Sequence, residues 1–207
     1  MIKIITVERE YGSGGGEVAQ LLSERLGWKL WDDLLTEEIA RLANCPKAVV
    51  EVREERNDPL YYRLFKSFLR GSYEGSINAY KLKLVDSETI LKMTERVVRH
   101  AAGKGNCVID VRGSQHFLED NPDTLRVFLY AAREDKVRRV MAGGKTEREA
   151  LELVDTVDHD RIDFIQRYFG VEWPTRSLFH IMLNTSLGEA IVVQTILQFM
   201  KTIESRG

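Results

Sequence analysis

The sequence lacks the features of a membrane protein, a disulfide-rich secreted protein or a nucleic-acid-binding protein. No apolar run approaches the roughly 20 residues that a membrane-spanning helix requires. Only two cysteines occur, Cys45 and Cys107, without C-x-x-C or metal-ligand spacing, so we expect reduced core residues in a cytoplasmic protein. The formal net charge is only −2, which argues against a broad basic face for nucleic acid. We therefore expect neither a membrane nor a nucleic acid as a partner.

The sequence also has few breaks. It contains only four prolines, and no internal repeat, low-complexity tract or flexible linker divides it. A chain of 207 residues can bury about 70% of its unfolded surface. We therefore expect a single domain, residues 1–207, that needs no disulfide bond or structural metal for stability. The first residues form an apolar run that leads directly into the chain, so we expect no signal peptide.

Apolar runs that are typical of buried strands alternate with helical patterns along the chain. Such alternation predicts an α/β fold, with a parallel sheet and helices on both of its faces. The expected strands cover residues 2–7, 28–31, 106–111, 125–131 and 180–183. The main expected helices cover residues 18–25, 34–43, 59–69, 86–102, 134–141 and 147–168, and a last helix, capped by Asn184, Thr185 and Ser186, ends near residue 203.

A glycine-rich stretch, R-E-Y-G-S-G-G-G-E at residues 9–17, lies between the first expected strand and the first expected helix. This layout is typical of a loop that cradles phosphate, because glycine lets the backbone turn with positive φ and bring its N–H groups against phosphate oxygens. The alternative is a glycine-rich turn without a ligand, but a turn alone does not need four glycines in five positions. The expected phosphate-binding residues are Gly12, Ser13, Gly14, Gly15, Gly16 and Glu17.

The loop lacks the lysine of the usual phosphate-binding pattern, G-x-x-x-x-G-K-[ST]. Gly15 stands in place of the lysine, and Glu17 in place of the serine or threonine. Arg9, at the start of the loop, or Arg112, after the third expected strand, could supply the missing charge. Alternatively, Arg9 forms an ion pair with a glutamate at position 8, 10 or 17. Glu17 could ligate Mg²⁺, or it could be a favourable acidic residue in the first turn of a helix.

Six segments can be compared with known kinases as a set. They are R-E-Y-G-S-G-G-G-E at 9–17, G-W-K-L-W-D-D at 27–33, V-I-D-V-R-G at 108–113, the segment from L-R-V-F-L-Y-A to K-V-R-R at 125–139, D-H-D-R at 158–161 and L-N-T-S at 183–186. Together they resemble the cytidylate kinase-like family, a divergent branch of the P-loop nucleoside monophosphate kinases. The resemblance implies a three-layer P-loop NTPase fold with a five-stranded parallel sheet, ATP as the phosphoryl donor and Mg²⁺ as the cofactor. It also implies a helical insert of the nucleoside-monophosphate-binding type within residues 34–102, and a lid within residues 133–167.

The resemblance assigns roles to individual residues. Arg112 matches an arginine that grips the acceptor phosphate, and a surface arginine is the alternative. Lys136 stands where related kinases have a lid arginine, and Arg138 or Arg139 is close enough to compensate, whereas a solvated basic face is the alternative. Asp158 and Arg161 match a pair that contacts the bound nucleotide, although at i and i+3 they could equally form a surface salt bridge. The candidate catalytic residues are therefore Arg9, Arg112, Lys136 and Arg139.

Other positions depart from the family pattern. Val154 replaces an upstream arginine, and Glu38 replaces an arginine for the acceptor phosphate, which weakens the case for CMP as the acceptor. Asp32 and Asp33 could meet Mg²⁺ through water, could bind a ribose or an amine, or could cap the helix expected at 34–43. The candidate acceptor-binding residues are Asp32, Asp33, Arg112, Asp158 and Arg161.

The sequence leaves three functions open. The first is ATP- and Mg²⁺-dependent transfer of a phosphoryl group to a small acceptor, most simply a nucleoside monophosphate. The second is a nucleotide-binding or regulatory protein that keeps the fold with lost or weak transfer, and the third is a kinase for a non-nucleotide acceptor. The expected partners are small-molecule nucleotides. The aromatic helix at 59–69 could stack a base, but we favour a role in filling a core or in a homodimer contact.

Overall fold

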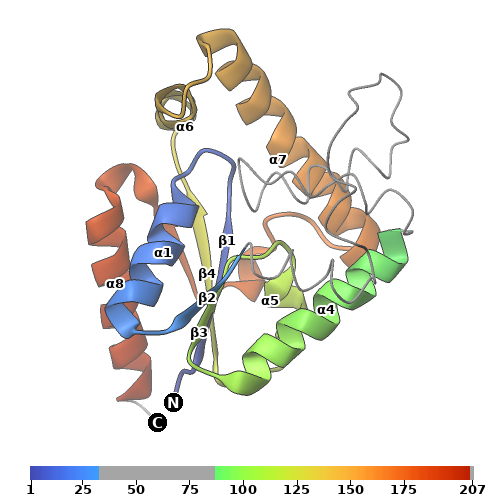
Figure 1. The fold of residues 1–207 in the computed structure, drawn as a ribbon, viewed down its shortest axis with the longest axis vertical. Coiled ribbons are helices and arrows are strands. Elements are labelled where there is room, and N and C mark those ends of the chain that lie inside the picture. Colours follow the sequence, from blue (N-terminus) through green and yellow to red (C-terminus); the bar gives the residue numbers. More distant parts are fainter. Residues whose placement is uncertain (33–86, 206–207) are drawn as a thin grey trace, which may run out of the picture.

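The computed structural model describes residues 1–32 and 87–205, which form a five-stranded sheet covered by helices (Figure 1). The strand order is β2-β3-β1-β4-β5, and all neighbouring strands are parallel. The expected parallel sheet is confirmed, with each strand within a few residues of its expected position. The strands are β1 (Ile4–Arg9), β2 (Lys29–Trp31), β3 (Cys107–Ile109), β4 (Thr124–Tyr130) and β5 (Ile181–Asn184). The helices expected at 34–43 and 59–69, together with Asp33, Glu38 and Cys45, lie outside the described residues.

The central strand is β1, which pairs with β3 on one side and with β4 on the other. Its residues from Ile4 to Glu8 are buried, which explains why the run is apolar with almost no alternation. Because the strands are parallel, their carboxyl ends meet at one edge of the sheet, where ligands gather in such folds. The glycine loop follows β1 at this edge.

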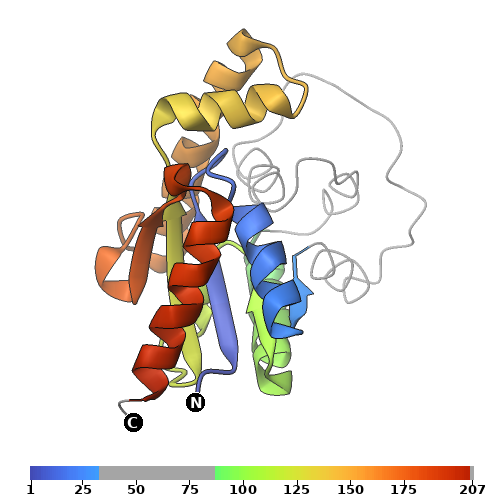
Figure 2. The same ribbon diagram turned by 90° about the vertical axis from the view of Figure 1, so that its left-hand side faces the viewer.

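Helices cover both faces of the sheet (Figures 1 and 2). The helices α1 (Gly15–Leu26) and α8 (Glu189–Glu204) pack on one face, and α4 (Ser87–Lys104) and α5 (Ser114–Phe117) pack on the other. The expected three-layer α/β arrangement is therefore present in the described part of the chain.

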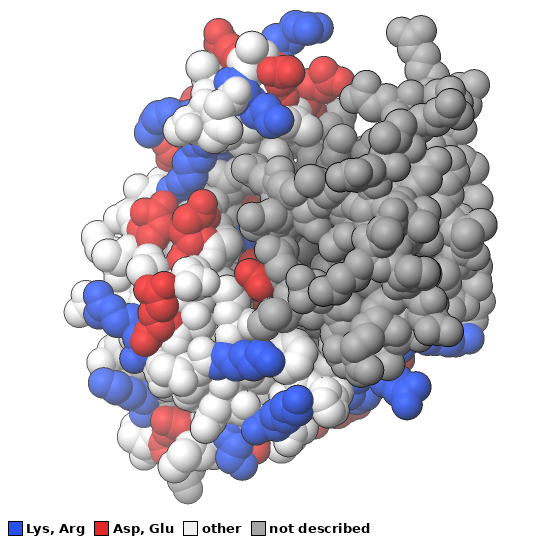
Figure 3. Space-filling view, in the orientation of Figure 1, with Lys and Arg blue, Asp and Glu red and all other residues white. Residues whose placement is uncertain are grey.

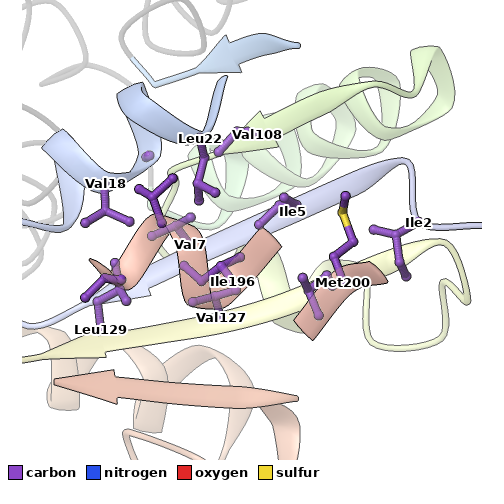
Figure 4. Packing of buried hydrophobic residues seen from close by; sticks show 14 residues of the cluster. Ile2, Ile5, Val7, Val18, Leu22, Val108, Val127, Leu129, Ile196 and Met200 are labelled. Atoms are coloured by element: carbon purple, nitrogen blue, oxygen red, sulfur yellow. The ribbon is translucent and has the colours of Figure 1, made fainter. Parts of the chain in front are cut away.

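A large cluster of buried apolar side chains lies between the sheet and the α1–α8 layer (Figure 4). Leu22 of α1 and Ile196 of α8 point toward Ile5 and Val7 of β1, and all four side chains are nearly inaccessible to solvent. Burial of one such side chain contributes about 1.5–3 kcal/mol. This packing fixes the position of α1, and hence of the loop that leads into it.

The helix α6 (Arg133–Ala142) and the first part of α7 (Glu147–Phe169) lie beyond the carboxyl edge of the sheet, and the last part of α7 packs with α4 and α5 (Figure 1). Thr146 begins α7 with a capping box, in which its side chain and that of Glu149 each satisfy a backbone N–H group. Val140 of α6 and Val154 of α7 are buried in one cluster with Tyr11 of the glycine loop. The α6–α7 pair, defined as residues 133–169, thus packs directly on the loop.

The expectation for the start of the last helix was wrong. A short 3₁₀ turn, η3 (Thr185–Leu187), lies between β5 and α8, and the Asn184 side chain caps this turn by accepting the Ser186 N–H at 2.9 Å. The helix α8 begins only at Glu189, after Gly188 with φ of 95°. A second 3₁₀ turn, η2 (Arg176–Leu178), precedes β5. The local cap signal was real, but it belongs to the shorter element.

The surface of the described part shows no single dominant charge in the view of Figure 3, where Lys and Arg are interspersed with Asp and Glu. None of the described helices combines the length and the apolar character that crossing a membrane would require.

Candidate phosphate-binding and acceptor site

The glycine loop is a tight connection between β1 and α1. Gly12 and Gly14 have φ of 72° and 75°, in the left-handed region that favours glycine. Gly14 is the N-cap of α1, and no side chain caps the first backbone N–H groups of this helix. The loop is tied to the sheet by the Glu10 N–H, which donates to the Leu129 carbonyl at 3.0 Å. A loop of this shape at a helix N-terminus presents N–H groups and a positive dipole end to an anion.

Arg9 ends β1 directly before the loop and forms an ion pair with Asp110, which follows β3. The partner in this ion pair is therefore Asp110, from a different strand, and not one of the expected glutamates at positions 8, 10 and 17. The two side chains are 14% and 5% exposed. Burial, and then the charge of Arg161, lower the pKa of Arg9 to about 10, so the guanidinium still carries its charge at neutral pH.

Two further arginines lie buried near this pair. Arg112, two residues after Asp110, is 4% exposed, and Arg161 of α7 is 2% exposed. Burial, and then the charge of Arg161, hold the pKa of Arg112 well below its usual value. The alternative of a surface arginine at position 112 is therefore wrong, and so is the alternative of a surface salt bridge between Asp158 and Arg161. Buried cations this close together raise one another's energy, and an anion between them would relieve it.

Glu8 fixes the chain beside Arg112. Its carboxylate is 3% exposed and accepts hydrogen bonds from the Gly113 N–H at 3.1 Å and from Gln115 Nε2 at 2.8 Å. The Arg112 guanidinium lies 5.9 Å from the centre of the Phe164 ring of α7. Arg112 is thus placed by the strand end, by the start of α5 and by α7 together.

Asp158 joins the α6–α7 pair to the loop. Its carboxylate accepts a hydrogen bond from the Tyr11 N–H at 2.8 Å and one from Lys136 Nζ at 3.3 Å, and it lies 3.6 Å from Arg161 Nη1. Lys136 also pairs with Glu10 at 3.1 Å, so Lys136 faces the loop and not the solvent. The alternative of a solvated basic face does hold for Arg138, which is exposed and pairs with Asp135 on its own helix.

Arg139 reaches from α6 to the far side of the loop. Its Nη2 donates to the Thr185 carbonyl at 2.9 Å and lies 3.4 Å from Glu189 Oε1. The Thr185 hydroxyl in turn donates to the Ser13 carbonyl. These contacts join α6, the 3₁₀ turn before α8 and the glycine loop, so Lys136 and Arg139 lie on two sides of the same loop.

The carboxylates expected to contact Mg²⁺ are Glu17, Asp32 and Asp33. Among the described residues, no group of three His, Cys, Asp or Glu side chains could form a metal site by itself. Glu17 and Asp32 are near enough to Arg9 that their negative charges partly offset the lowering of its pKa. Asp33 lies outside the described residues. Mg²⁺ needs only one or two carboxylates when substrate phosphates and water supply the other ligands. Glu17 in the first turn of α1 and Asp110 beside Gly16 are two carboxylates near the loop that could serve.

Sequence reasoning missed Asp110, Thr185 and Glu8 as residues that build this site. Asp110 carried a usable signal, because it follows a buried strand and therefore lies at the carboxyl edge of the sheet. The contacts of Glu8 and Thr185 depend on the packing of distant segments, and no local pattern indicates them.

A family model described as the cytidylate kinase-like family matches residues 4–187. The chain belongs to this family. A search of curated protein sequences finds no match. The family assignment confirms the resemblance that the six sequence segments indicated.

Solved structures with the same fold include an uncharacterized protein from Eubacterium ventriosum, at 22% identity and a TM-score of 0.69 over 98% of this chain and 99% of that chain. A shikimate kinase from Acinetobacter baumannii, in complex with shikimate, is 17% identical with a TM-score of 0.52 over 98% and 94%. A gluconokinase from Sinorhizobium meliloti is 12% identical with a TM-score of 0.55 over 99% and 94%. At these identities the likeness establishes the α/β fold of P-loop kinases for this member of the cytidylate kinase-like family.

Proposed function

We propose that this protein transfers a phosphoryl group from ATP to a small acceptor, most simply a nucleoside monophosphate. The observation that carries the proposal is the convergence of cations on the glycine loop. Arg9 and Arg112 come from strand ends, Arg161 comes from α7, and Lys136 and Arg139 come from α6. Phosphoryl transfer needs two substrates held in line and positive charge around the transferred group, and it needs little covalent chemistry from the protein.

The arrangement suggests a division of roles. The backbone N–H groups of the loop and the start of α1 would hold the donor phosphates, with Arg9 and Arg139 on either side. Arg112 and Arg161 would hold the anionic group of the acceptor, because both are buried and near each other beside the same loop. Bound Mg²⁺, held by the phosphates with Glu17 or Asp110, would neutralise charge on the transferred group.

A second candidate function is nucleotide binding without efficient transfer. The absence of the loop lysine and the engagement of Lys136 by Asp158 and Glu10 favour it. A non-nucleotide acceptor is supported by the valine at position 154, which is buried against the loop where the family pattern has an arginine.

A thermal-shift screen separates these candidates. We expect ATP with Mg²⁺ to raise the melting temperature, because a ligand that binds only the native state stabilises it by mass action. ADP formation should then be measured with CMP, dCMP, AMP, UMP, shikimate and gluconate as acceptors. A shift with ATP but no ADP with any acceptor would support the regulatory function, and no shift even at millimolar ATP would exclude all three candidates.

Matched arginine variants test the acceptor role. We expect Arg112→Gln to raise the KM for the acceptor at least about tenfold, because a charge-assisted hydrogen bond is lost. Arg138→Gln, which removes an exposed arginine of α6, should leave the KM unchanged. Equal KM values in the two variants would remove Arg112 from the acceptor site.

A further inference from the structure

The two unusual residues of the glycine loop, Arg9 and Gly15, pack against each other. When the pattern G-x-x-x-x-G-K-[ST] is aligned without gaps on Gly14 and Gly15, its first glycine falls on Arg9, and its serine or threonine falls on Gly16 and not on Glu17. The usual loop therefore has glycine at the position of Arg9 and a cation at the position of Gly15. This chain has the reverse at both positions.

A steric contact links the two positions. A Cβ atom added to Gly15 would lie 2.8 Å from the Cβ of Arg9, closer than real Cβ atoms come to other atoms, and a tight 3.1 Å from its Cγ. The Cβ of residue 9 cannot move away without moving β1. Only one of the two positions can therefore carry a side chain while the backbone keeps this shape.

Backbone conformation does not explain the glycine at position 15. Gly15 is the first residue of α1 and is not among the glycines with positive φ, in contrast to Gly12 and Gly14. A Cβ added to the next residue, Gly16, would meet nothing nearer than Arg9 Nη2 at 3.8 Å, which is ordinary van der Waals contact. The steric requirement that Arg9 imposes thus applies to position 15 and not to the neighbouring position 16.

The same contact places the charge of Arg9. Its aliphatic stem crosses Gly15, and its guanidinium lies beside Gly16 in the first turn of α1, where Asp110 holds it. A loop lysine at position 15 would also belong to this turn. The cation therefore reaches the start of α1 from the end of β1 and not from the helix itself.

We propose that Arg9 and Gly15 are a reciprocal exchange of the glycine and lysine of the usual loop, in which Arg9 supplies the phosphate-facing charge of the nucleoside triphosphate site. The inference rests on the proposed function for its charge component, whereas its steric component concerns the folded chain alone. The exchange explains why both positions differ from the pattern together. Arginine at position 9 alone would clash with a lysine at position 15, and glycine at position 15 alone would leave the loop without a cation.

Melting temperatures test the steric component without any ligand. We expect Gly15→Ala to melt about 5 °C or more below the wild type, because overpacking is destabilising, while the matched control Gly16→Ala stays within about 2 °C. In an Arg9→Gly background, Gly15→Ala should lower the melting temperature no more than Gly16→Ala does. In an Arg9→Met background, which keeps an aliphatic side chain at position 9, Gly15→Ala should still lower the melting temperature. An equal effect of Gly15→Ala in the wild-type and Arg9→Gly backgrounds would overturn the exchange.

Nucleotide affinity tests the charge component. Arg9→Met should bind ATP roughly tenfold more weakly or worse, because it keeps the packing but removes the charge. The double variant Arg9→Gly/Gly15→Lys, which restores the usual loop, should recover most of the affinity, whereas Arg9→Gly/Gly15→Ala should not. Should the Arg9→Gly variants fail to fold, Arg9→Met and Arg9→Lys make the same comparison, with affinity lost in the first and largely kept in the second.

The outcomes separate this proposal from the proposed function. Wild-type affinity for ATP in Arg9→Met, or no recovery in a folded Arg9→Gly/Gly15→Lys variant, would overturn the exchange while leaving nucleotide binding in place. Absence of ATP binding by the wild type would overturn the proposed function and the charge component together. The ligand-free melting temperatures would still decide the steric link.

Discussion

His180, directly before β5, is held in its neutral form by its surroundings. Its Nδ1 accepts a hydrogen bond from the Arg126 N–H at 3.0 Å, and its Nε2 lies 3.0 Å from Arg126 Nη2. Burial, and then the charge of Arg126, lower the pKa of His180 below its usual value. Between the folded and the unfolded pKa the unfolded state binds more protons, so the free energy of unfolding falls as the pH drops below about 6.5.

We therefore expect the melting temperature to decrease between pH 7.5 and pH 5.5, and to decrease less in His180→Asn. Asparagine does not titrate, and its amide oxygen can still accept the Arg126 N–H. His116, whose pKa burial also lowers, should keep part of the dependence in the variant. Melting curves at several pH values measure the effect, and identical slopes in both proteins would contradict it.

The candidate site could be predicted residue by residue only in part. The glycines, Arg9 and Arg112 stand beside strong local patterns, a buried strand followed by a turn, and the structure places all of them at the carboxyl edge of the sheet. The partner of Arg9 could not be predicted from spacing, because Asp110 comes from a different strand. The burial of Arg161 could not be predicted either, because the i, i+3 spacing of Asp158 and Arg161 is the same for a surface pair and for a buried pair.

Among the elements, α7 is hydrogen-bonded to the glycine loop through Asp158. We expect Asp158→Ala to lower the free energy of unfolding by about 1–3 kcal/mol, because in a largely buried place the Tyr11 N–H would lose its acceptor and Lys136 would keep only Glu10. Asp155→Ala is the matched control on the same helix. Asp155 is 55% exposed and pairs with exposed Arg133, so its loss should change the free energy by less than about 1 kcal/mol.

Urea denaturation of the two variants measures the difference. A similarly small effect of both substitutions would contradict the prediction and show that the contact between α7 and the loop adds little to stability.

Element types were easier to predict than element ends. The strands and the long helices of residues 1–32 and 87–205 have clear periodicity, and the structure confirms them within a few residues. The prediction for the segment after β5 was wrong, because Asn184 is a good cap for either an α-helix or a 3₁₀ turn. The Thr185 hydroxyl, bonded to the Ser13 and Tyr130 carbonyls, helps to fix this segment as a turn, and that contact exists only in the folded protein.

At the scale of the whole molecule, the layer structure followed from the order of elements alone. Alternating strands and helices leave few arrangements besides a parallel sheet covered on both faces. The sequence did not indicate how the α6–α7 pair would sit, because its position depends on contacts of Val140, Val154 and Tyr11 between remote segments. The same contacts bring the two helices onto the glycine loop (Figure 1).

Because the Tyr11 N–H is bonded to Asp158, the neighbouring amides of Glu10 and Tyr11 can report on two different opening motions. The Glu10 amide donates to Leu129 within the sheet, whereas the Tyr11 amide donates to a side chain of α7. In deuterated solvent, Glu10 should exchange only when the sheet opens, and Tyr11 whenever α7 moves away from the loop. The ratio of the two exchange rates would therefore measure how often the α6–α7 pair detaches from the loop, and a nucleotide that holds the pair in place should slow Tyr11 selectively.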